Sequence, residues 1–589
     1  MSGTAALSND IDPVLLEVVK NGFDTIADEM ALILMRTAYS SIARDSMDYS
    51  TAICDAQGRT LAQGLTLPMH LGSFPDAMRH LINRYRGRVD PGDVFIANDP
   101  YVAAGQHLPD IYIIKPIFLD VALIGWATTI AHQADVGGII PGSNSIGATE
   151  IYQEGLRLPA LKLYEQGRRN DAIWEIIETN VRVPDKVLGD LRAQLASCTT
   201  GEREFTELVR RHGIPTMARY IEALHDYAEA LARQQITGIP DGVYAFTDHI
   251  DGLGEAPEPI VLKVKVEVRG DRVHVDWAGT SAQVPGGINA PLSFTKSNVY
   301  AALRSIMSAD VPNCEGYTRP ITVTAPEGTL VNVRHPGACG ARGITGYRIV
   351  DCMFGALIQA VPERLTADSS GGSTLPTFAG YQDGKPFVFT ECVLGPWGAA
   401  PGHDGQDGVP HMAANMSNVP VEFIEADYPL RVEQYGLVAD TGGPGRHRGG
   451  LSLIREYRVL ADRALVSVRS DKRTHPPHGA EGGLPGGGST SIVNPGRGER
   501  VLPVLMTEPI LLAKGDVLRH VMAGGGGYGD PYERDPAHVL EDIVEGRVTP
   551  EHARTAYGVA IVGGETPGID RAETARLRQG RSAADRTGA

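Results

Sequence analysis

Three short polar clusters in the N-terminal part of the chain carry residue types that bind metal ions. They are RDSMDYSTAICD (residues 44–55), NDPYVAAGQHLPD (residues 98–110) and AHQADVGG (residues 131–138). His107 and Asp110 are three residues apart, so both can face one ion from a single turn, while His132 ends an apolar run. Two imidazoles and one or two carboxylates that converge from different strand ends predict a site for Zn²⁺, Fe²⁺ or Mn²⁺.

Each cluster also has a simpler explanation. A histidine and an aspartate at this spacing are common in solvated loops, Asp99 before a proline favours a turn, and Asp48 can cap a strand end. What favours a metal site is that all three clusters adjoin the end of an apolar strand, where the sites of α/β proteins tend to form.

Two further features are candidates for substrate contact. His70, in PMHLGS (residues 68–73), is either a packed histidine or one that faces a substrate. The glycine-rich run GACGARGITGY (residues 337–347) contains Arg342. This run can hold a carboxylate or a phosphate in a nest of backbone amides, or it can be an ordinary bend between a strand and a helix.

The elements that must position these residues are short and of mixed type. Asp12 and Pro13 open a helix whose apolar face continues to about residue 36. At about residue 240 the helical pattern changes to alternation, with a hairpin that turns at Gly270 and Asp271. The segments expected to form buried strands are residues 51–55, residues 93–99 and two strands within residues 110–131.

These patterns predict an α+β class: a multi-lobed fold with short strands, an N-terminal α/β metal-binding region and a glycine-rich, β-dominated C-terminal half. The expected division is residues 1–235 for the metal-binding region, 236–380 for a mixed hairpin and helix region, 381–530 for the glycine-rich β region, 531–565 for a helical pair and 566–589 for a charged tail.

The composition excludes several classes of function. The chain has 589 residues, of which 42% are hydrophobic and 21% charged, as in globular proteins with a sizeable core. A net charge of −17 disfavours nucleic-acid binding, and no apolar run is long enough for a membrane span. No signal peptide is visible, and six widely spaced cysteines favour buried thiols in a cytoplasmic protein. The 69 glycines and 39 prolines indicate many tight turns.

Several common catalytic motifs are absent from the sequence. It contains no GxxxxGK[ST] phosphate loop, no HExxH helix and no GxSxG nucleophile elbow. The GxGxxG match at residues 524–529 leads into Asp530 and Pro531 without a βαβ unit around it, so it indicates a glycine-rich turn.

The same clusters carry a resemblance to the hydantoinase B / oxoprolinase family. The chain resembles this family in order from about residue 12 to residue 557, with departures at Gln133 and at GPWGA (residues 395–399) that leave the substrate open. The segments that carry the resemblance are MHLGS (69–73), NDPY (98–101), HLPD (107–110), HQADVGG (132–138), ATEIYQEGLRLP (148–159), GDLRAQ (189–194), YPLRVEQYGLVADTGGPGRHRGGL (428–451) and GGGGYGDPYERDP (524–536).

The resemblance implies a two-subunit, ATP-dependent enzyme. A hydantoinase A-type ATPase subunit would phosphorylate the oxygen of a cyclic amide (a hydantoin, 5-oxoproline or a lactam), and this chain would open the ring by hydrolysis at one divalent transition metal. The missing phosphate loop suits this division of labour. The expected assembly is a hetero-oligomer with two or more copies of each subunit. The alternatives are a subunit of a ketone carboxylase of the acetone or acetophenone type, and a non-catalytic scaffold for the ATPase subunit.

The resemblance also assigns roles to residues. It implies Asp48, His107, Asp110 and His132 as metal ligands, with DYS (residues 48–50) favouring Asp48 over Asp45 as the ligand from the first cluster. The carboxylates expected in catalysis are Asp48 and Asp135, the latter (or Asp99) by orienting a ligand histidine. The residues expected to bind substrate are His70, Asn98 and Arg342.

Overall fold

The computed structural model describes residues 11–372, 374–563 and 567–580. Its first lobe is built on a seven-stranded antiparallel sheet with the order β2-β1-β5-β4-β3-β6-β7. The strands are β1 (Tyr49–Asp55), β2 (Thr60–Gln63), β3 (Val94–Ala97), β4 (Asp110–Leu119), β5 (Ala122–His132), β6 (Leu161–Glu165) and β7 (Arg168–Arg169). The strands expected within residues 51–55, 93–99 and 110–131 are therefore confirmed.

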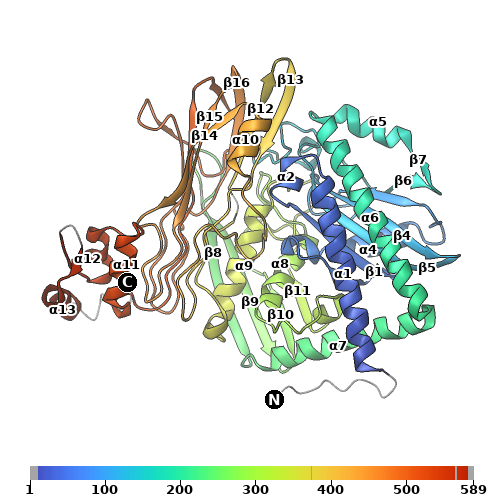
Figure 1. Ribbon diagram of the computed structural model, residues 1–589, viewed down its shortest axis with the longest axis horizontal. Helices are drawn as coiled ribbons and strands as arrows, with labels where there is room; N and C mark the ends of the chain where they lie inside the picture. Colours follow the sequence, from blue (N-terminus) through green and yellow to red (C-terminus); the bar gives the residue numbers. More distant parts are fainter. Residues whose placement is uncertain (1–10, 373, 564–566, 581–589) are drawn as a thin grey trace.

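Helices cover both faces of this sheet, which is why its central strands are apolar on both sides. Ile53, Ile113 and Ala127 pack with α1 (Pro13–Thr37) and α6 (Pro184–His212), while Cys54, Tyr112 and Trp126 pack with α4 (Phe74–Arg84). Figure 1 shows α1 and α6 lying side by side across the sheet. Helix α1 starts as expected, with the Asp12 side chain accepting a hydrogen bond from the Val14 N–H at 2.9 Å and a proline in the first turn.

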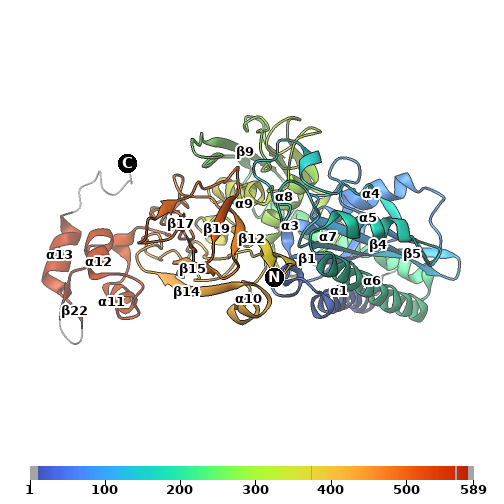
Figure 2. The ribbon, with the colours of Figure 1, turned by 90° about the horizontal axis from the view of Figure 1, so that it is seen from above.

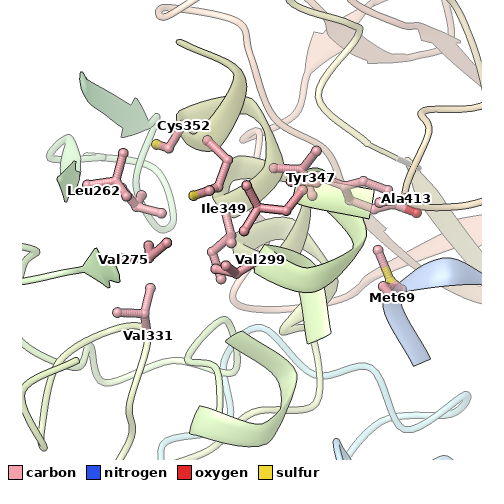
Figure 3. Close-up of a cluster of buried hydrophobic side chains, with 14 of the residues drawn as sticks. Met69, Leu262, Val275, Val299, Val331, Tyr347, Ile349, Cys352 and Ala413 are labelled. Carbon is pink, nitrogen blue, oxygen red and sulfur yellow. The ribbon is translucent and has the colours of Figure 1, made fainter. Parts of the chain in front are cut away.

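The second lobe packs two helices on a four-stranded sheet. Its order is β11-β10-β9-β8, and the expected hairpin is β9 (Ile260–Arg269) and β10 (Arg272–Asp276). Figure 3 shows Leu262 and Val275 of this hairpin facing Val299, Ile349 and Cys352, which come from the two helices. The remaining members are β8 (Gly242–Ile250), β11 (Ile321–Thr324), α8 (Leu292–Ser305) and α9 (Gly343–Leu357).

The third lobe consists of two sheets that share a core. Phe378 and Tyr457 meet at its centre with ring centroids 5.3 Å apart. The first sheet has the order β13-β12-β16-β19, with β12 (Leu375–Gln382), β13 (Lys385–Thr390), β16 (Arg463–Arg469) and β19 (Ile510–Ala513). The second has the order β14-β15-β20-β17-β18, with β14 (Leu430–Val438), β15 (Ser452–Val459), β17 (Thr490–Val493), β18 (Arg500–Val501) and β20 (Val517–Val521). The expected boundary at residues 380/381 is wrong, because it falls inside β12.

Much of the glycine excess lies where backbone segments touch rather than in turns alone. The Gly443 N–H donates to the Gly525 carbonyl at 2.7 Å, and a Cβ on Gly449 would lie 1.9 Å from the same oxygen. A side chain at such a position would collide with backbone, so the GGGGYG run permits a close packing of loops.

A small helical appendage ends the described chain (Figure 2). It contains α11 (Pro536–Val544), α12 (Pro550–Tyr557), α13 (Arg571–Gln579), β21 (Ile561–Val562) and β22 (Gly568–Ile569). The expected charged tail contains a helix at residues 571–579, where Asp570 caps α13 by accepting from the Glu573 N–H and Thr574 is buried. The prediction that no signal peptide is present rests on the N-terminal residues, of which residues 1–10 lie outside the described residues. The end of the predicted tail, residues 581–589, also lies outside them.

The other helices are α2 (Ser41–Arg44), α3 (Pro68–Leu71), α5 (Asp171–Asn180), α7 (Ile214–Thr237) and α10 (Val421–Asp427). Together with several small sheets they confirm the predicted α+β, multi-lobed class. All six cysteine side chains are buried, as expected. Within the described ranges, no helix is both long enough and apolar enough to cross a membrane.

Candidate metal centre

Three neighbouring strands end together and bring distant polar residues to one point. Strand β5 lies between β1 and β4, so His132 at the end of β5 is opposite Asp110 at the start of β4. On the other side, the His132 N–H donates to the carbonyl oxygen of Asp48, just before β1, at 3.0 Å. The antiparallel ladder therefore sets the spacing of these three residues.

His107 joins the cluster from the loop before β4. Its Nδ1 lies 2.7 Å from the carbonyl oxygen of Gly340, which can only accept, so Nδ1 carries a proton and donates. The other ring nitrogen, Nε2, lies 3.0 Å from Asp110 Oδ1. A histidine that is held by one nitrogen and offers the other is the usual arrangement of a metal ligand.

Four buried atoms in this cluster have no hydrogen-bond partner among the described residues: Asp48 Oδ1, His107 Nε2, Asp110 Oδ1 and His132 Nδ1. An unsatisfied buried polar atom costs about 1–3 kcal/mol, so four together call for a common partner. His107, Asp110 and His132 offer ligand atoms that all lie within 4.8 Å of one another. Asp48 lines the same cavity, whose volume of about 20 Å³ suits an ion and a water molecule.

The electrostatics of the cluster also suit a cation. Burial lowers the pKa of His70 to about 3 and that of His107 to about 4, so both are neutral near pH 7 with a lone pair available. Burial opposes ionisation of Asp110, but Arg342 and the two histidines hold its pKa well below its usual range. Burial and the adjacent Asp110 raise the pKa of Asp48 to about 8, although Arg342 and Arg469 act in the opposite direction.

Two of the three expected substrate-binding residues lie at this cavity. His70 Nε2 is 3.5 Å from Asp110 Oδ2 and 3.7 Å from Asp48 Oδ1, so this histidine belongs to the cluster itself. Arg342 donates through Nη2 to the side chains of Gln106 and Asp110, and its guanidinium lies 4.4 Å from the centre of the Phe294 ring.

The third, Asn98, does not reach the cavity. Its side-chain amide donates to the carbonyl oxygens of Leu108 and Leu156 and accepts from the Leu158 N–H, which uses both ends of the group within the fold. Substrate binding by Asn98 is therefore wrong for this geometry.

Asp135 is also placed away from the cluster, and the expectation that it orients a ligand histidine is wrong. Both of its oxygens are bound to Arg182 and to the N–H groups of Gly137 and Gly142. It ties together the loop after β5. Asp99 likewise binds Arg157 and two backbone N–H groups. Asp45 pairs with Arg44, so Asp48 is the residue of the first cluster that faces the cavity.

Sequence reasoning missed two residues of the site. Arg469, the last residue of β16, lines the cavity from the third lobe, and its Nη1 donates to Asn144 Oδ1 at 2.9 Å. Asn144 Nδ2 lies 3.1 Å from His132 Nε2, so this amide joins Arg469 to a candidate ligand. The site therefore extends beyond the expected N-terminal region of residues 1–235.

Comparison with known proteins places the chain in a family. Residues 12–531 match the family model described as Hydantoinase B/oxoprolinase. The chain is 36% identical over 586 residues to a putative D-/L-hydantoinase subunit from Pseudomonas sp. (strain NS671), covering 97% of this chain and 98% of that one. It superposes on the crystal structure of an ATP-dependent caprolactamase from Pseudomonas jessenii with a TM-score of 0.89 and 30% identity, covering 97% of this chain and 100% of that one. A nucleotide-free acetone carboxylase has the same fold, with a TM-score of 0.90 at 20% identity over 96% of this chain and 82% of that one.

Proposed function

The chain belongs to the hydantoinase B/oxoprolinase family, and from that premise we propose that it is the metal-dependent subunit of an ATP-dependent cyclic amide hydrolase. A hydantoin, 5-oxoproline or a lactam, activated by phosphorylation on a hydantoinase A-type ATPase subunit, is opened by water at the cluster of Asp48, His107, Asp110 and His132. The likeness to a hydantoinase subunit and to a caprolactamase supports this reaction class.

The observation that carries the proposal is the set of four unsatisfied buried atoms on residues 48, 107, 110 and 132. A scaffold that only supported a partner subunit would gain nothing from burying them, because each is costly without a ligand. The donor set of two imidazoles and two carboxylates fits Zn²⁺, Fe²⁺ or Mn²⁺.

The reaction needs activation because an amide carbonyl is a weak electrophile. Nitrogen donates electron density into the carbonyl group, and phosphorylation of the oxygen makes the carbon more electrophilic. Addition of water and expulsion of the ring nitrogen, which takes up a proton, open the ring to an acyl phosphate, and a second water converts this to the carboxylate and inorganic phosphate. When bound, the metal supplies Lewis acidity, which lowers the pKa of water toward neutrality.

The residues of the chain have separate tasks in this reaction. Asp48, His107, Asp110 and His132 hold the metal. His70 stays neutral and presents Nε2 toward the cluster, where it accepts a hydrogen bond from water or from a ring N–H. Arg342 fixes the position of Asp110 through an ion pair. The cavity admits little bulk water, which protects an activated substrate from premature hydrolysis.

The chain has no phosphate loop, which suits an ATP site on a partner subunit. The relative named as one subunit of a hydantoinase supports a partner chain, and we expect a hetero-oligomer with two or more copies of each. The acidic balance disfavours nucleic acid as a partner.

The test is reconstitution with a hydantoinase A-type subunit and ATP. Hydantoins, 5-oxoproline, lactams and small ketones are each supplied with and without bicarbonate, and products are identified by mass spectrometry. Ring opening that requires both subunits and ATP is the expected result, and light scattering gives the stoichiometry. Bicarbonate-dependent carboxylation of a ketone would favour the carboxylase alternative over hydrolysis. If no substrate reacted, the alternative of a non-catalytic scaffold for the ATPase subunit would remain.

A further inference from the structure

Arg469 differs from every other buried arginine in the described part of the chain. Six arginine side chains are buried there, and five lie within 4.0 Å of a carboxylate oxygen. These five are Arg342, Arg348, Arg448, Arg455 and Arg534. Arg469, only 8% exposed, has no such partner: Nη1 binds the neutral Asn144 amide, and Nε has no hydrogen-bond partner in the described residues.

An isolated buried charge is costly, because desolvation of an ion is repaid only by a counter-charge. Burial lowers the pKa of Arg469, the expected sign for a guanidinium without a counter-ion. The described residues offer Arg469 no carboxylate within 4.0 Å, and its position beside the metal cluster indicates where an anion would bind.

A second donor faces the same cavity. Arg342 Nε is also buried without a hydrogen-bond partner among the described residues, although its Nη2 holds Asp110 and Gln106. Asp48, Asp110, Arg342 and Arg469 together carry no net charge when all are ionised. A divalent metal would leave the site with a net positive charge, which attracts an anionic ligand.

We propose that Arg469, supported by Arg342, forms an anion subsite that binds the phosphoryl group of the activated substrate. This inference rests on the proposed function and names the substrate class of the same site. A guanidinium matches two phosphoryl oxygens through paired N–H donors, which an ammonium group cannot do.

Two cavities around Arg469 provide space for the phosphoryl group. Arg469 and Leu375 line both the cavity at the cluster and a second one of about 10 Å³ that also contacts Asn144 and Thr377. Each alone holds about one or two water molecules. Because Arg469 lines both cavities, an anion bound by its guanidinium would lie where the two meet.

The test uses inorganic phosphate as the probe and the full, metal-loaded chain without its partner. Titration calorimetry compares wild type with Arg469→Gln and Arg469→Lys, and with Arg463→Gln, an exposed arginine at the other end of β16. Loss of a charge-assisted pair predicts about tenfold to hundredfold weaker phosphate binding for Arg469→Gln, a partial loss for Arg469→Lys and no change for Arg463→Gln. Metal content and melting temperature show that each variant is loaded and folded.

The outcomes separate this inference from the proposed function. Unchanged phosphate affinity in a folded, metal-loaded Arg469→Gln variant would overturn the subsite, as would wild type that does not bind phosphate. Bicarbonate that binds tighter than phosphate, and loses affinity in Arg469→Gln, would overturn the phosphoryl assignment. Phosphate binding that depends on Arg469, in a chain that opens no ring with any ATPase subunit, would support the subsite and reject the proposed reaction.

Discussion

The His132 N–H donates to the carbonyl oxygen of Asp48 at 3.0 Å, so two candidate ligands far apart in the sequence are held by one rung of a β-ladder. Asp110 is opposite His132 on the other side of β5. Three candidate ligands at the ends of adjacent strands form a rigid part of the site, because their spacing is fixed by backbone hydrogen bonds rather than by side-chain packing.

Loss of one ligand should remove the metal. We expect His107→Ala to purify with far less than one metal ion per chain. Only three donors would remain, and the candidate site needs several side chains to bind the ion together. Elemental analysis of dialysed protein measures this, with His538→Ala, an exposed histidine on α11, as the matched control. Full metal content in His107→Ala, or none in wild type, would contradict the site.

The stability of the fold should fall in acid because buried histidines are neutral. Burial lowers the pKa of His520 to about 3, against about 6.5 in an unfolded chain, and its side chain is fully buried beside Ser491. Between these two pKa values the unfolded chain binds more protons than the folded one, so the free energy of unfolding rises with pH. The contribution of His520 is fully present above about pH 6.5 and is lost as pH falls toward 3.

One proton corresponds to about 1.4 kcal/mol per pH unit. From pH 7 to pH 5.5, wild type should therefore lose about 1 kcal/mol more stability than His520→Gln, as measured by denaturant unfolding. His538→Gln, which makes the same substitution at an exposed position, serves as the control. Equal pH dependence of wild type and His520→Gln would refute this assignment.

Asp135 should prove structural. Asp135→Ala removes four hydrogen bonds, two from the loop after β5 and two from Arg182, and leaves Arg182 without its carboxylate partner, which we expect to destabilise the fold by about 2–4 kcal/mol. Metal content should stay near that of wild type, because Asp135 touches none of the candidate ligands. A stable variant that had lost its metal would restore the predicted catalytic role.

Much of the first lobe could be predicted because its signals are local. The cap at Asp12, the apolar strands of residues 110–131 and the polar residues at their ends can be identified within a few residues of sequence. The same local signals gave wrong predictions for Asp135 and Asn98. Both residues follow apolar strands, as ligands would, but their side chains form hydrogen bonds with nearby backbone groups instead.

Arg469 and Asn144 could not be found in this way. Nothing in VSVRSDK (residues 466–472) distinguishes one arginine from others, and its importance comes from a contact with Asn144 across two lobes. Helix α13 was missed for a related reason, since RAETARLRQ has little apolar periodicity. Its Glu573 is bound by Arg554 and Arg576, and such polar contacts leave no hydrophobic pattern.

Asn144→Asp provides the most direct test of the unpaired charge, because it gives Arg469 the carboxylate that the fold lacks. The new charge-assisted contact should raise the free energy of unfolding by about 1–3 kcal/mol, while the anion subsite, now neutralised from within, should bind inorganic phosphate about tenfold more weakly. Thermal melts and titration calorimetry measure the two effects on the same metal-loaded protein. Asn144→Leu, which removes the amide without adding charge, should lose stability instead and keep Arg469 available to phosphate. If Asn144→Asp bound phosphate as tightly as wild type, the free guanidinium of Arg469 would not be the group that holds the anion.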